Sequence, residues 1–420
     1  MNHYHDPVRQ LKYLRQTLSQ NKKPLGFFLS AGCPLAVQMP SGTWPLIPDI
    51  AGLTKFVSDG LKSKDKNKNK YDLLLDELNK TGNKNPNIED ILSFVRGLKQ
   101  VSVGAKDVRG LTEKDLTILE KNICKKIVEK TNVSLPNHDT PYHQLAQWIH
   151  LIDRNDFPIE CFTTNYDLLT EQAFEEIGVA YFDGFVGSRQ PFFDLRAIED
   201  SLIPKHWTRL WKVHGSINWF LNSNQEVYRS TNVNESDSYI IHPSHLKYDQ
   251  SKKMPYLALI DRLNSFLRQT SAVLITNGYS FGDIHLNDTI VNALKANPTA
   301  IVIALLYGTN TYKDKDGKII SRYDKAFAYA KNRFNLSAWT FDEAVIGGQQ
   351  GKWDLSKQDA LAEGNLADAI IQNIETVKAK ESEEEEKITH YQLQLGDFAK
   401  FGNFLQALIG EEQFKVEDAK

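Results

Sequence analysis

Two residues in this sequence have side chains suited to holding a hydroxyl group and to moving a proton, and each follows an apolar run. Asn165 comes directly after the run 159–163, and His214 follows the run 209–213. An amide both donates and accepts hydrogen bonds, so Asn165 can hold a hydroxyl or a water. A histidine with an unperturbed pKa of about 6.5 can accept a proton near neutral pH. We predict Asn165 and His214 as catalytic residues, with Asp167 orienting the Asn165 amide.

Two further segments contain small residues that let the backbone approach a ligand. Residues 30–34 follow an apolar run that begins at Leu25, and residues 276–287 follow the run 272–276. Gly-rich turns at strand ends bind diphosphates through backbone N–H groups and a helix N-terminus. In the second segment, Ser280 and Asp283 can bond ribose hydroxyls. The predicted ligand-binding residues are Ser30, Ala31, Gly32, Cys33, Asp49, Thr164, Gly278, Ser280, Phe281 and Asp283.

Each segment also has a purely structural interpretation. Residues 30–34 fit a plain tight turn, and Thr164, Asp167 or Asp283 can cap a following helix. A lone histidine beside tryptophans, as at His214, is more often a packed core residue. The combination of four such segments, each after an apolar run, is what favours a binding site.

Short apolar runs alternate with helical periodicity along the chain. They begin at Leu25 and occupy 159–163, 209–213, 272–276 and 300–307, and several are followed by polar turn residues. This alternation predicts an α/β fold with a Rossmann-like parallel sheet flanked by helices. Such sheets bind ligands at the carboxyl ends of their strands, which is where the four polar segments stand.

Helical spacing elsewhere predicts the remaining architecture. We predict a helical insertion at 51–139, with helices over 71–80, 88–100 and 111–128, and a C-terminal helical extension at 346–420. Residues 1–50 and 140–345 then form the catalytic domain.

The C-terminal extension has two notable features. Its acidic run, 381–387, is predicted as an exposed helix face or a linker. Further on, apolar residues recur at helical spacing, so this helix either packs on its own domain or forms an oligomer interface. These residues are Phe398, Phe401, Phe404, Leu405 and Leu408.

Composition limits the classes of function. The 420 residues carry 50 Lys and Arg against 53 Asp and Glu, and a net charge of −3 creates no field that would gather nucleic acid. The longest apolar run, 300–307, is far shorter than the roughly 20 residues of a membrane-spanning helix. Residues 1–24 lack an apolar signal core. We therefore predict a cytoplasmic protein without direct nucleic-acid or membrane contact.

The cysteines and histidines show no familiar metal-binding spacing. The three cysteines are far apart, so neither a disulfide framework nor a four-thiolate zinc site is expected. His138 with His143, and His242 with His245, lack Cys or carboxylate partners at familiar spacings. No metal site is predicted.

Taken together, the four segments resemble the sirtuin superfamily, and more closely the sirtuin-like domains of prokaryotic antiphage defence than the protein deacylases. The resemblance covers residues 20–50 and 140–310. The first turn has Ser30 where the family usually has Gly, and Pro34 replaces a common Ser. The family's phosphate-binding turn falls on Ser30, Ala31 and Gly32, its catalytic Asn and Asp on Asn165 and Asp167, its base on His214, and its later nucleotide-binding Gly and Ser on Gly278 and Ser280.

The resemblance implies an NAD+ glycohydrolase that cleaves the nicotinamide–ribose bond, releases nicotinamide and ADP-ribose, and depletes NAD+ in antiviral defence. It implies a diphosphate at Ala31 and Gly32, an adenosine near 278–283, and a nicotinamide near Asn165 and His214. The chain lacks the two Cys-x-x-Cys elements that fold the zinc ribbon of sirtuin deacylases. Their absence favours water over a peptide as the acceptor.

The resemblance also implies partners. Stand-alone defence sirtuins suggest a large homo-oligomer and a HerA-type hexameric ATPase as partner, and this chain has no P-loop motif of its own. Two other functions remain open. One is a non-catalytic NAD+ or ADP-ribose sensor that controls a partner through assembly, and the other is mono-ADP-ribosyl transfer to protein or DNA.

Overall fold

The centre of the protein is one large sheet. The structure is a computed structural model that describes residues 3–64, 68–152, 156–199, 202–222, 224, 226–231, 237–241, 255–313, 317–355, 369–378 and 385–410. The strands of the central sheet are β1 (Tyr4–His5), β2 (Leu25–Leu29), β3 (Glu160–Thr163), β4 (Tyr181–Phe182), β7 (Thr208–Lys212), β11 (Val273–Asn277), β12 (Ile301–Leu305), β15 (Leu336–Trp339), β16 (Glu343–Ile346) and β17 (Gln349–Trp353). Their order is β1-β17-β16-β15-β12-β11-β2-β3-β7-β4.

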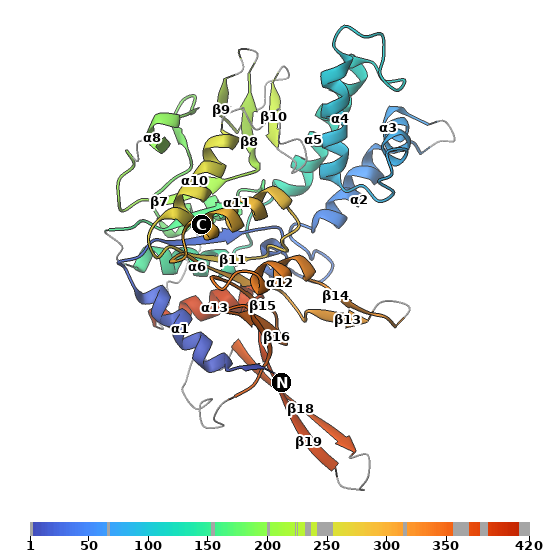
Figure 1. Ribbon diagram of the computed structural model, residues 1–420. Coiled ribbons are helices and arrows are strands. Elements are labelled where there is room, and N and C mark those ends of the chain that lie inside the picture. Colours follow the sequence, from blue (N-terminus) through green and yellow to red (C-terminus); the bar gives the residue numbers. More distant parts are fainter. Residues whose placement is uncertain are drawn as a thin grey trace.

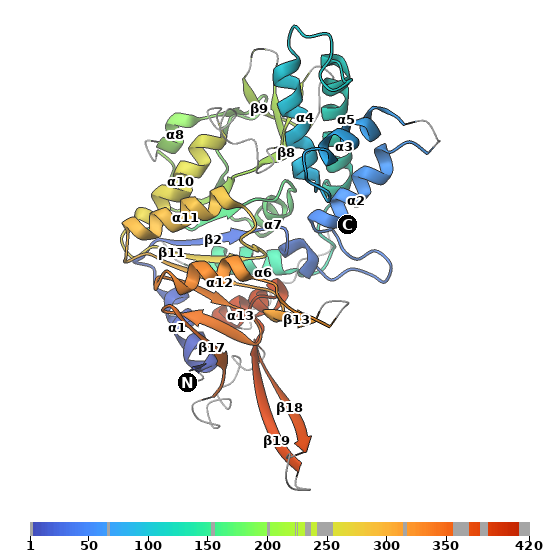
Figure 2. The same cartoon turned by 45° about the vertical axis from the view of Figure 1, so that its right-hand side comes forward.

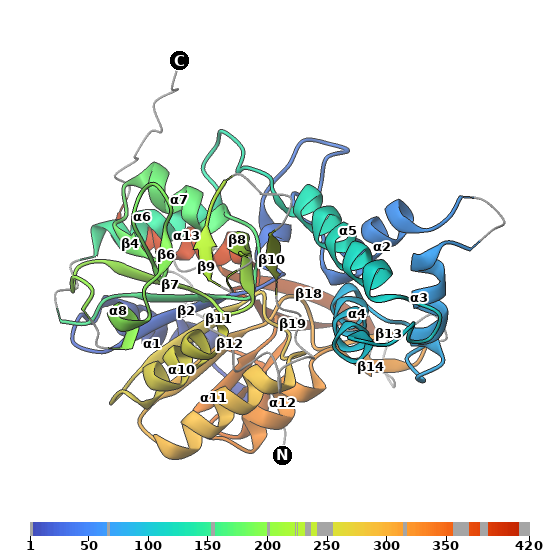
Figure 3. The ribbon, with the colours of Figure 1, turned by 90° about the horizontal axis from the view of Figure 1, so that it is seen from above.

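All neighbouring strands in this ten-stranded sheet are parallel, except that β16 runs antiparallel to both β15 and β17. Helices cover both faces, and Figure 3 shows α10, α11 and α12 on one side and α6, α7 and α13 on the other. The mixed α/β fold with a mostly parallel sheet confirms the predicted fold class. The helices named here are α6 (Pro141–Leu151), α7 (Leu169–Ile177), α10 (Tyr256–Arg268), α11 (Ile284–Ala296), α12 (Asp324–Lys331) and α13 (Phe398–Ile409).

The central strands are largely buried because both of their faces are covered; β2 and β12 are apolar throughout, whereas β3 and β7 also bury Glu160, Arg209 and Lys212. Successive side chains of a strand point to opposite faces. Phe27 of β2 accordingly packs in the cluster that includes α6, α7, α13 and α1 (Pro7–Ser19), whereas Phe28 packs in the cluster that includes α10, α11 and α12. A strand buried on two faces reads as a nearly continuous apolar run, and β2 and β12 show this pattern most clearly.

The register of the central strands brings four chain segments to one edge of the sheet. Leu29 of β2 pairs with Asn277 of β11 and with Thr163 of β3, and Thr163 pairs with Lys212 of β7. The last residues of these four strands therefore stand in one row. The turns that follow them emerge side by side at the carboxyl edge.

The region between β2 and β3 is helical, as the sequence predicts for 51–139. It contains α2 (Ile50–Leu61), α3 (Lys70–Asn79), α4 (Ile88–Ser102) and α5 (Glu113–Thr131), and Figure 1 shows them grouped at one end of the molecule. They share an apolar cluster that also takes in Tyr166, Ile217 and Ile241. The insertion therefore packs on the segment that follows β3 and on a second sheet.

That second sheet has five antiparallel strands in the order β10-β8-β9-β6-β5. The sequence analysis does not predict it. Most of these strands are short, so they lack the long apolar runs that mark the central sheet. They are β5 (Phe185–Val186), β6 (Phe192–Phe193), β8 (Gly215–Leu221), β9 (Val227–Arg229) and β10 (Ser238–Ile241).

Smaller elements complete the described chain. The 3-10 helix η1 (Cys33–Ala36) follows β2, the short helix α8 (Leu195–Glu199) follows β6, and a hairpin joins β13 (Thr311–Lys313) to β14 (Ile319–Ser321). No helix in these described ranges is long and apolar enough to span a bilayer.

The predicted C-terminal helical extension is wrong for most of its described length. β17 joins the sheet edge between β1 and β16, because Gly351 and Trp353 alternate inward with the period of a strand. β18 (Ile370–Lys378) and β19 (Glu385–Leu393) form a hairpin that projects from the body (Figure 2). Of the acidic run 381–387, residues 385–387 belong to β19 instead of a helix, and 381–384 lie outside the described residues.

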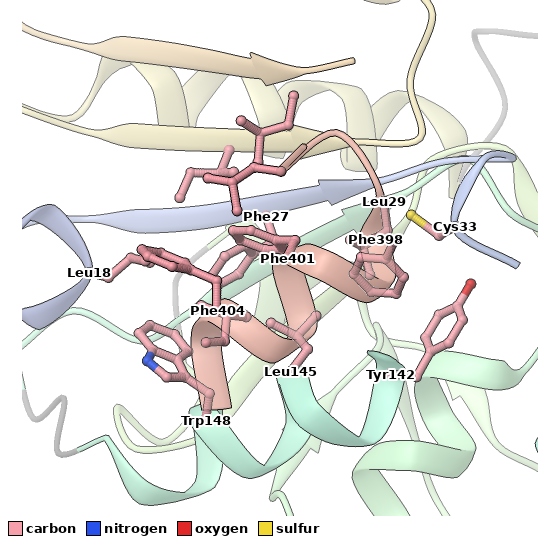
Figure 4. Close-up of a cluster of buried hydrophobic side chains, with 14 of the residues drawn as sticks. Leu18, Phe27, Leu29, Cys33, Tyr142, Leu145, Trp148, Phe398, Phe401 and Phe404 are labelled. Carbon is pink, nitrogen blue, oxygen red and sulfur yellow. The ribbon is translucent and has the colours of Figure 1, made fainter. Parts of the chain in front are cut away.

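Among the described residues of this extension, α13 is the only α-helix, and its apolar face is buried within the chain. The Phe401 ring lies 6.1 Å from Phe27 of β2, and Phe398 meets Tyr142 of α6 with ring centroids 5.1 Å apart. Figure 4 shows these rings in one cluster with Phe404 and Trp148. The helix therefore packs on its own domain, which was one of the two predicted alternatives.

Candidate functional site

A cavity of about 270 Å³ lies at the carboxyl edge of the sheet, where the turns after β2, β3, β7 and β11 meet. All three predicted catalytic residues line it, although they come from two different turns. Of the predicted ligand-binding residues, half line it as well. The lining residues that the sequence analysis predicts are Ser30, Ala31, Thr164, Asn165, Asp167, His214, Ser280 and Asp283.

Two of the other predicted binding residues, Gly32 and Gly278, pack against each other behind the cavity. A Cβ on Gly32 would lie 2.7 Å from the Gly278 Cα, and one on Gly278 would lie 2.7 Å from the Cys33 nitrogen. Gly278 also has a φ of +71°, which favours glycine. The two glycines allow the turns after β2 and β11 to touch, and the Gly32 nitrogen donates to the Gly278 oxygen at 3.1 Å.

The remaining three predicted binding residues also have structural contacts. The buried Cys33 thiol donates to the Asn277 carbonyl oxygen at 3.3 Å, and burial raises its pKa. Asp49 caps α2 by accepting from the Gly52 nitrogen at 2.8 Å. Phe281 is fully buried, with a φ of +60°. None of the three is among the residues that line the cavity.

Asn165 is half-buried at the cavity and is held by two neighbouring turns. Its backbone nitrogen donates to Thr163 Oγ1 at 3.0 Å, and its side-chain Nδ2 donates to the Ser30 carbonyl oxygen at 3.3 Å. The hydroxyls of Ser30 and Thr164 lie 2.6 Å apart. These contacts fix the Asn165 amide against the turn that was predicted to bind phosphate.

His214 lies across the same cavity at the end of β7, with only 5% of its side chain exposed. Its Nε2 lies 3.1 Å from Asp283 Oδ2. The other oxygen of Asp283 accepts from the backbone nitrogens of His285 at 2.9 Å and Leu286 at 3.2 Å. Asp283 therefore caps α11, as the structural alternative proposed, and contacts the predicted base at the same time.

Asp167 is buried beside a lysine that the sequence analysis did not single out. Its Oδ1 accepts from the nitrogen of Leu169, the first residue of α7, at 3.1 Å, but the N-cap of that helix is Leu168, which makes no side-chain capping bond. Burial raises the pKa of the Asp167 carboxyl, and Lys212 opposes this effect. The buried Lys212 ammonium donates to the Asp167 carbonyl oxygen and, at 2.8 Å, to Glu171 Oε1.

The helical insertion supplies part of the cavity wall, including Leu53, Asn87, Glu89 and Thr131. Tyr166, next to Asn165, donates its hydroxyl to Glu89 Oε1 at 3.4 Å. The sequence alone gives no sign that these residues belong to the site. Asn87 and Glu89 stand at the start of a predicted helix, but that signal says nothing about which surface the helix faces.

Two histidine pairs were considered as metal ligands. His143 uses Nδ1 to contact Thr140 at 2.9 Å and Nε2 to contact Glu176 at 2.7 Å. His242 and His245 lie outside the described residues. Within the described ranges, the structure brings together no group of three or more His, Cys, Asp or Glu side chains that could hold a metal ion.

Comparisons with known proteins point to one family. The model of a family described as "SIR2-like domain" matches residues 159–328, which include β3, β7 and β11 with Asn165, His214 and Asp283. No curated protein matches the chain. A solved structure described as "Structural Basis for the Mechanism and Regulation of Sir2 Enzymes" is similar at 13% identity, with 70% of this chain and 85% of that chain covered and a TM-score of 0.30. At this TM-score the overlap defines neither fold nor function.

Proposed function

We propose that the protein is an NAD+ hydrolase that breaks the bond between nicotinamide and ribose and releases nicotinamide and ADP-ribose. The SIR2-like match over residues 159–328 supports the use of NAD+. One observation carries the proposal. Asn165 and His214 lie in the turns after two different strands, far apart in the sequence, and line one cavity together with the turn at Ser30 and Ala31.

We place NAD+ along the carboxyl edge of the sheet. Its diphosphate lies at the turn of Ser30 and Ala31, its adenosine lies toward Ser280, and its nicotinamide end lies between Asn165 and His214. The support is the arrangement of these lining residues and the small side chains of the first turn. Apolar lining residues from the segment before and within α2, such as Pro48 and Leu53, give the cavity a wall that suits a flat ring.

The reaction breaks one bond and forms one. The glycosidic electron pair leaves with the ring nitrogen of nicotinamide, which becomes neutral, and the ribose carbon acquires oxocarbenium character. The oxygen of a water then bonds to that carbon. Asn165 holds the water or a ribose hydroxyl, and His214 accepts the proton that the water loses.

Product analysis of purified variants tests the proposal. Wild type is expected to convert NAD+ into nicotinamide and ADP-ribose, which chromatography separates. His214→Ala is expected to lose on the order of 10²- to 10⁴-fold in rate, the usual contribution of general acid–base catalysis, and Asn165→Ala is expected to lose activity as well. His150→Ala, at an exposed position on α6, is the matched control and keeps the wild-type rate.

Three results would change the conclusion. Wild-type turnover in both Asn165→Ala and His214→Ala would end the assignment of these residues. Binding of NAD+ without release of nicotinamide, with or without a partner, would favour a sensor. Label transferred from NAD+ to protein or DNA would favour ADP-ribosyl transfer.

We further propose that NAD+ depletion serves antiviral defence, and that the protein works as a large homo-oligomer with a HerA-type hexameric ATPase. The support is the sequence resemblance. Mass photometry and co-purification with such an ATPase would test the assembly. A monomer that hydrolyses NAD+ at full rate at every concentration would contradict it.

A further inference from the structure

The contact between His214 and Asp283 joins two cavity-lining side chains from separate turns. The Nε2···Oδ2 distance is 3.1 Å, and the exposed fractions of the two side chains are 5% and 8%. A hydrogen bond between an imidazole and a carboxylate that are both shielded from water is stronger than an exposed one. This contact therefore constrains the orientation of the His214 ring.

Asp283 is itself held in place by the backbone around it. Its Oδ1 accepts two backbone hydrogen bonds from the first turn of the 13-residue helix α11. The Tyr279 hydroxyl donates to Asn287 Oδ1 at 2.7 Å, and the Asn287 amide donates to the Phe281 carbonyl oxygen at 2.9 Å. The loop that carries Asp283 is thus tied to the helix that Asp283 caps, and Oδ2 is held toward His214.

This geometry determines which ring nitrogen carries the proton. An ionised carboxylate only accepts hydrogen bonds, so in a neutral imidazole the nitrogen facing it must be the protonated one. In that tautomer the proton is on Nε2 and the lone pair is on Nδ1. We propose that Asp283 is a positioning residue that fixes the Nε2–H tautomer of His214, so that Nδ1 accepts the proton during catalysis. The catalytic part of this assignment rests on the proposed NAD+ hydrolysis, whereas the tautomer does not.

Asp283→Asn separates this role from helix capping. Asparagine is as good a helix N-cap as aspartate, so its single carbonyl oxygen can keep the bonds from His285 and Leu286. Its NH2 group then faces His214 Nε2 and donates to it, which moves the ring proton to Nδ1. We expect kcat to fall on the order of 10²- to 10⁴-fold, while the melting temperature stays near that of wild type.

The tautomer can be measured directly from the 15N chemical shifts of the imidazole nitrogens in histidine-labelled protein. The His214 signals are identified by their loss in His214→Gln. Wild type is expected to show the Nε2–H tautomer, and Asp283→Asn the Nδ1–H tautomer. Substitution of a residue that only stabilises the fold would not switch the tautomer of His214.

Two further variants keep the test decisive. Asp397→Asn makes the same change at the N-cap of α13, where Asp397 Oδ1 accepts from the Ala399 nitrogen at 2.9 Å, and it should leave kcat and the His214 signals unchanged. Asp283→Ser retains a capping hydroxyl but removes the carboxylate. If Asp283→Asn does not fold, Asp283→Ser is expected to lower kcat and to weaken the preference for Nε2–H.

Each outcome bears on a different claim. Unchanged kcat in the folded Asp283→Asn protein, or an Nδ1–H tautomer in wild type, would overturn the positioning role. Tautomer reversal in a protein that never hydrolyses NAD+ would support the His214–Asp283 assignment and overturn the proposed reaction instead.

Discussion

At the scale of single residues, the site depends on close contacts between turns that are distant in the sequence. Gly32 and Gly278 are in contact, Asn165 bonds the Ser30 carbonyl, and the hydroxyls of Ser30 and Thr164 pair. None of these contacts requires a charged group. They set how near the turns after β2, β3 and β11 come to one another, and so they define the shape of the cavity.

Gly278→Ala is expected to weaken both folding and NAD+ binding. The added Cβ would lie 2.7 Å from the Cys33 nitrogen and 2.9 Å from the Ser30 carbonyl oxygen, and both are backbone atoms that cannot move aside cheaply. Overpacking of this kind costs about 1–3 kcal/mol of unfolding free energy. Urea unfolding and calorimetric titration with NAD+ would measure the two effects.

Gly82→Ala is the control for backbone strain alone. Gly82 has a φ of +97°, but a Cβ there would meet nothing within 4 Å. The Gly82→Ala variant should lose stability without losing affinity for NAD+. Equal losses of affinity in the two variants would show that the contact between the turns does not shape the cavity.

At the scale of elements, an ion-pair network connects the helical insertion to the second sheet. Glu120 of α5 pairs with Arg96 of α4 at 2.7 Å and with Lys99 at 2.9 Å. Arg96 also donates to the carbonyl oxygen of Ile241 in β10 at 2.6 Å. The network joins two helices of the insertion to the second sheet, so it helps to hold the insertion where Asn87 and Glu89 line the cavity.

Glu120→Gln is expected to destabilise the protein at neutral pH and to have less effect in acid. Burial raises the pKa of Glu120, but the charges of Arg96 and Lys99 outweigh burial and leave it below the ordinary value of 4.5. A carboxyl with a lowered folded pKa stabilises above its unfolded pKa and loses that contribution as pH falls through the folded pKa. We expect Glu120→Gln to lower the free energy of unfolding by about 1.5–3 kcal/mol at pH 7.

Chemical denaturation of wild type and Glu120→Gln at pH 7, 5 and 4 would measure the difference between their free energies of unfolding. It should shrink as the pH falls below 4.5. Glu129→Gln is the control, because Glu129 pairs with Lys126 while 54% of its side chain is exposed, and such pairs contribute about 0–1 kcal/mol. A loss in Glu120→Gln that is the same at every pH would show that charge is not its cause.

At the scale of the whole molecule, early and late parts of the chain complete one fold. β1 pairs with β17, with Tyr4 opposite Lys352. Helix α13 packs on β2 and α6, and the Asn277 amide at the end of β11 donates to the Leu395 carbonyl oxygen at 3.1 Å. Residues near the C-terminus thereby support the strands that carry the cavity.

Phe401→Ala is expected to destabilise the fold without changing the oligomeric state. Phe401 is fully buried against Phe27, and a buried Phe→Ala change costs about 3–5 kcal/mol. Urea unfolding gives the stability, and native mass spectrometry gives the mass of the assembly. A change in assembly mass with little loss of stability would mean that α13 is an interface helix after all. Leu257→Ala, at an exposed position on α10, is the comparison for a neutral apolar truncation.

The sequence by itself determined five strands of the central sheet and the edge of the sheet at which the candidate site lies. The apolar runs correspond to β2, β3, β7, β11 and β12 to within a few residues, because strands covered on both faces are mostly apolar. Parallel strands end at the same edge, so Asn165 and His214 could be expected to lie close together from their positions after two such runs.

Only the tertiary structure decided which of the residues near that edge face the cavity and which support it. Gly32, Cys33, Gly278 and Phe281 lie in the predicted turns but pack behind the lining, and Asp283 contacts His214 across 69 positions of sequence. β17 is a strand because β1 and β16 pair with it. Local periodicity records which side of an element is apolar, whereas these contacts depend on strand register and on the approach of distant turns.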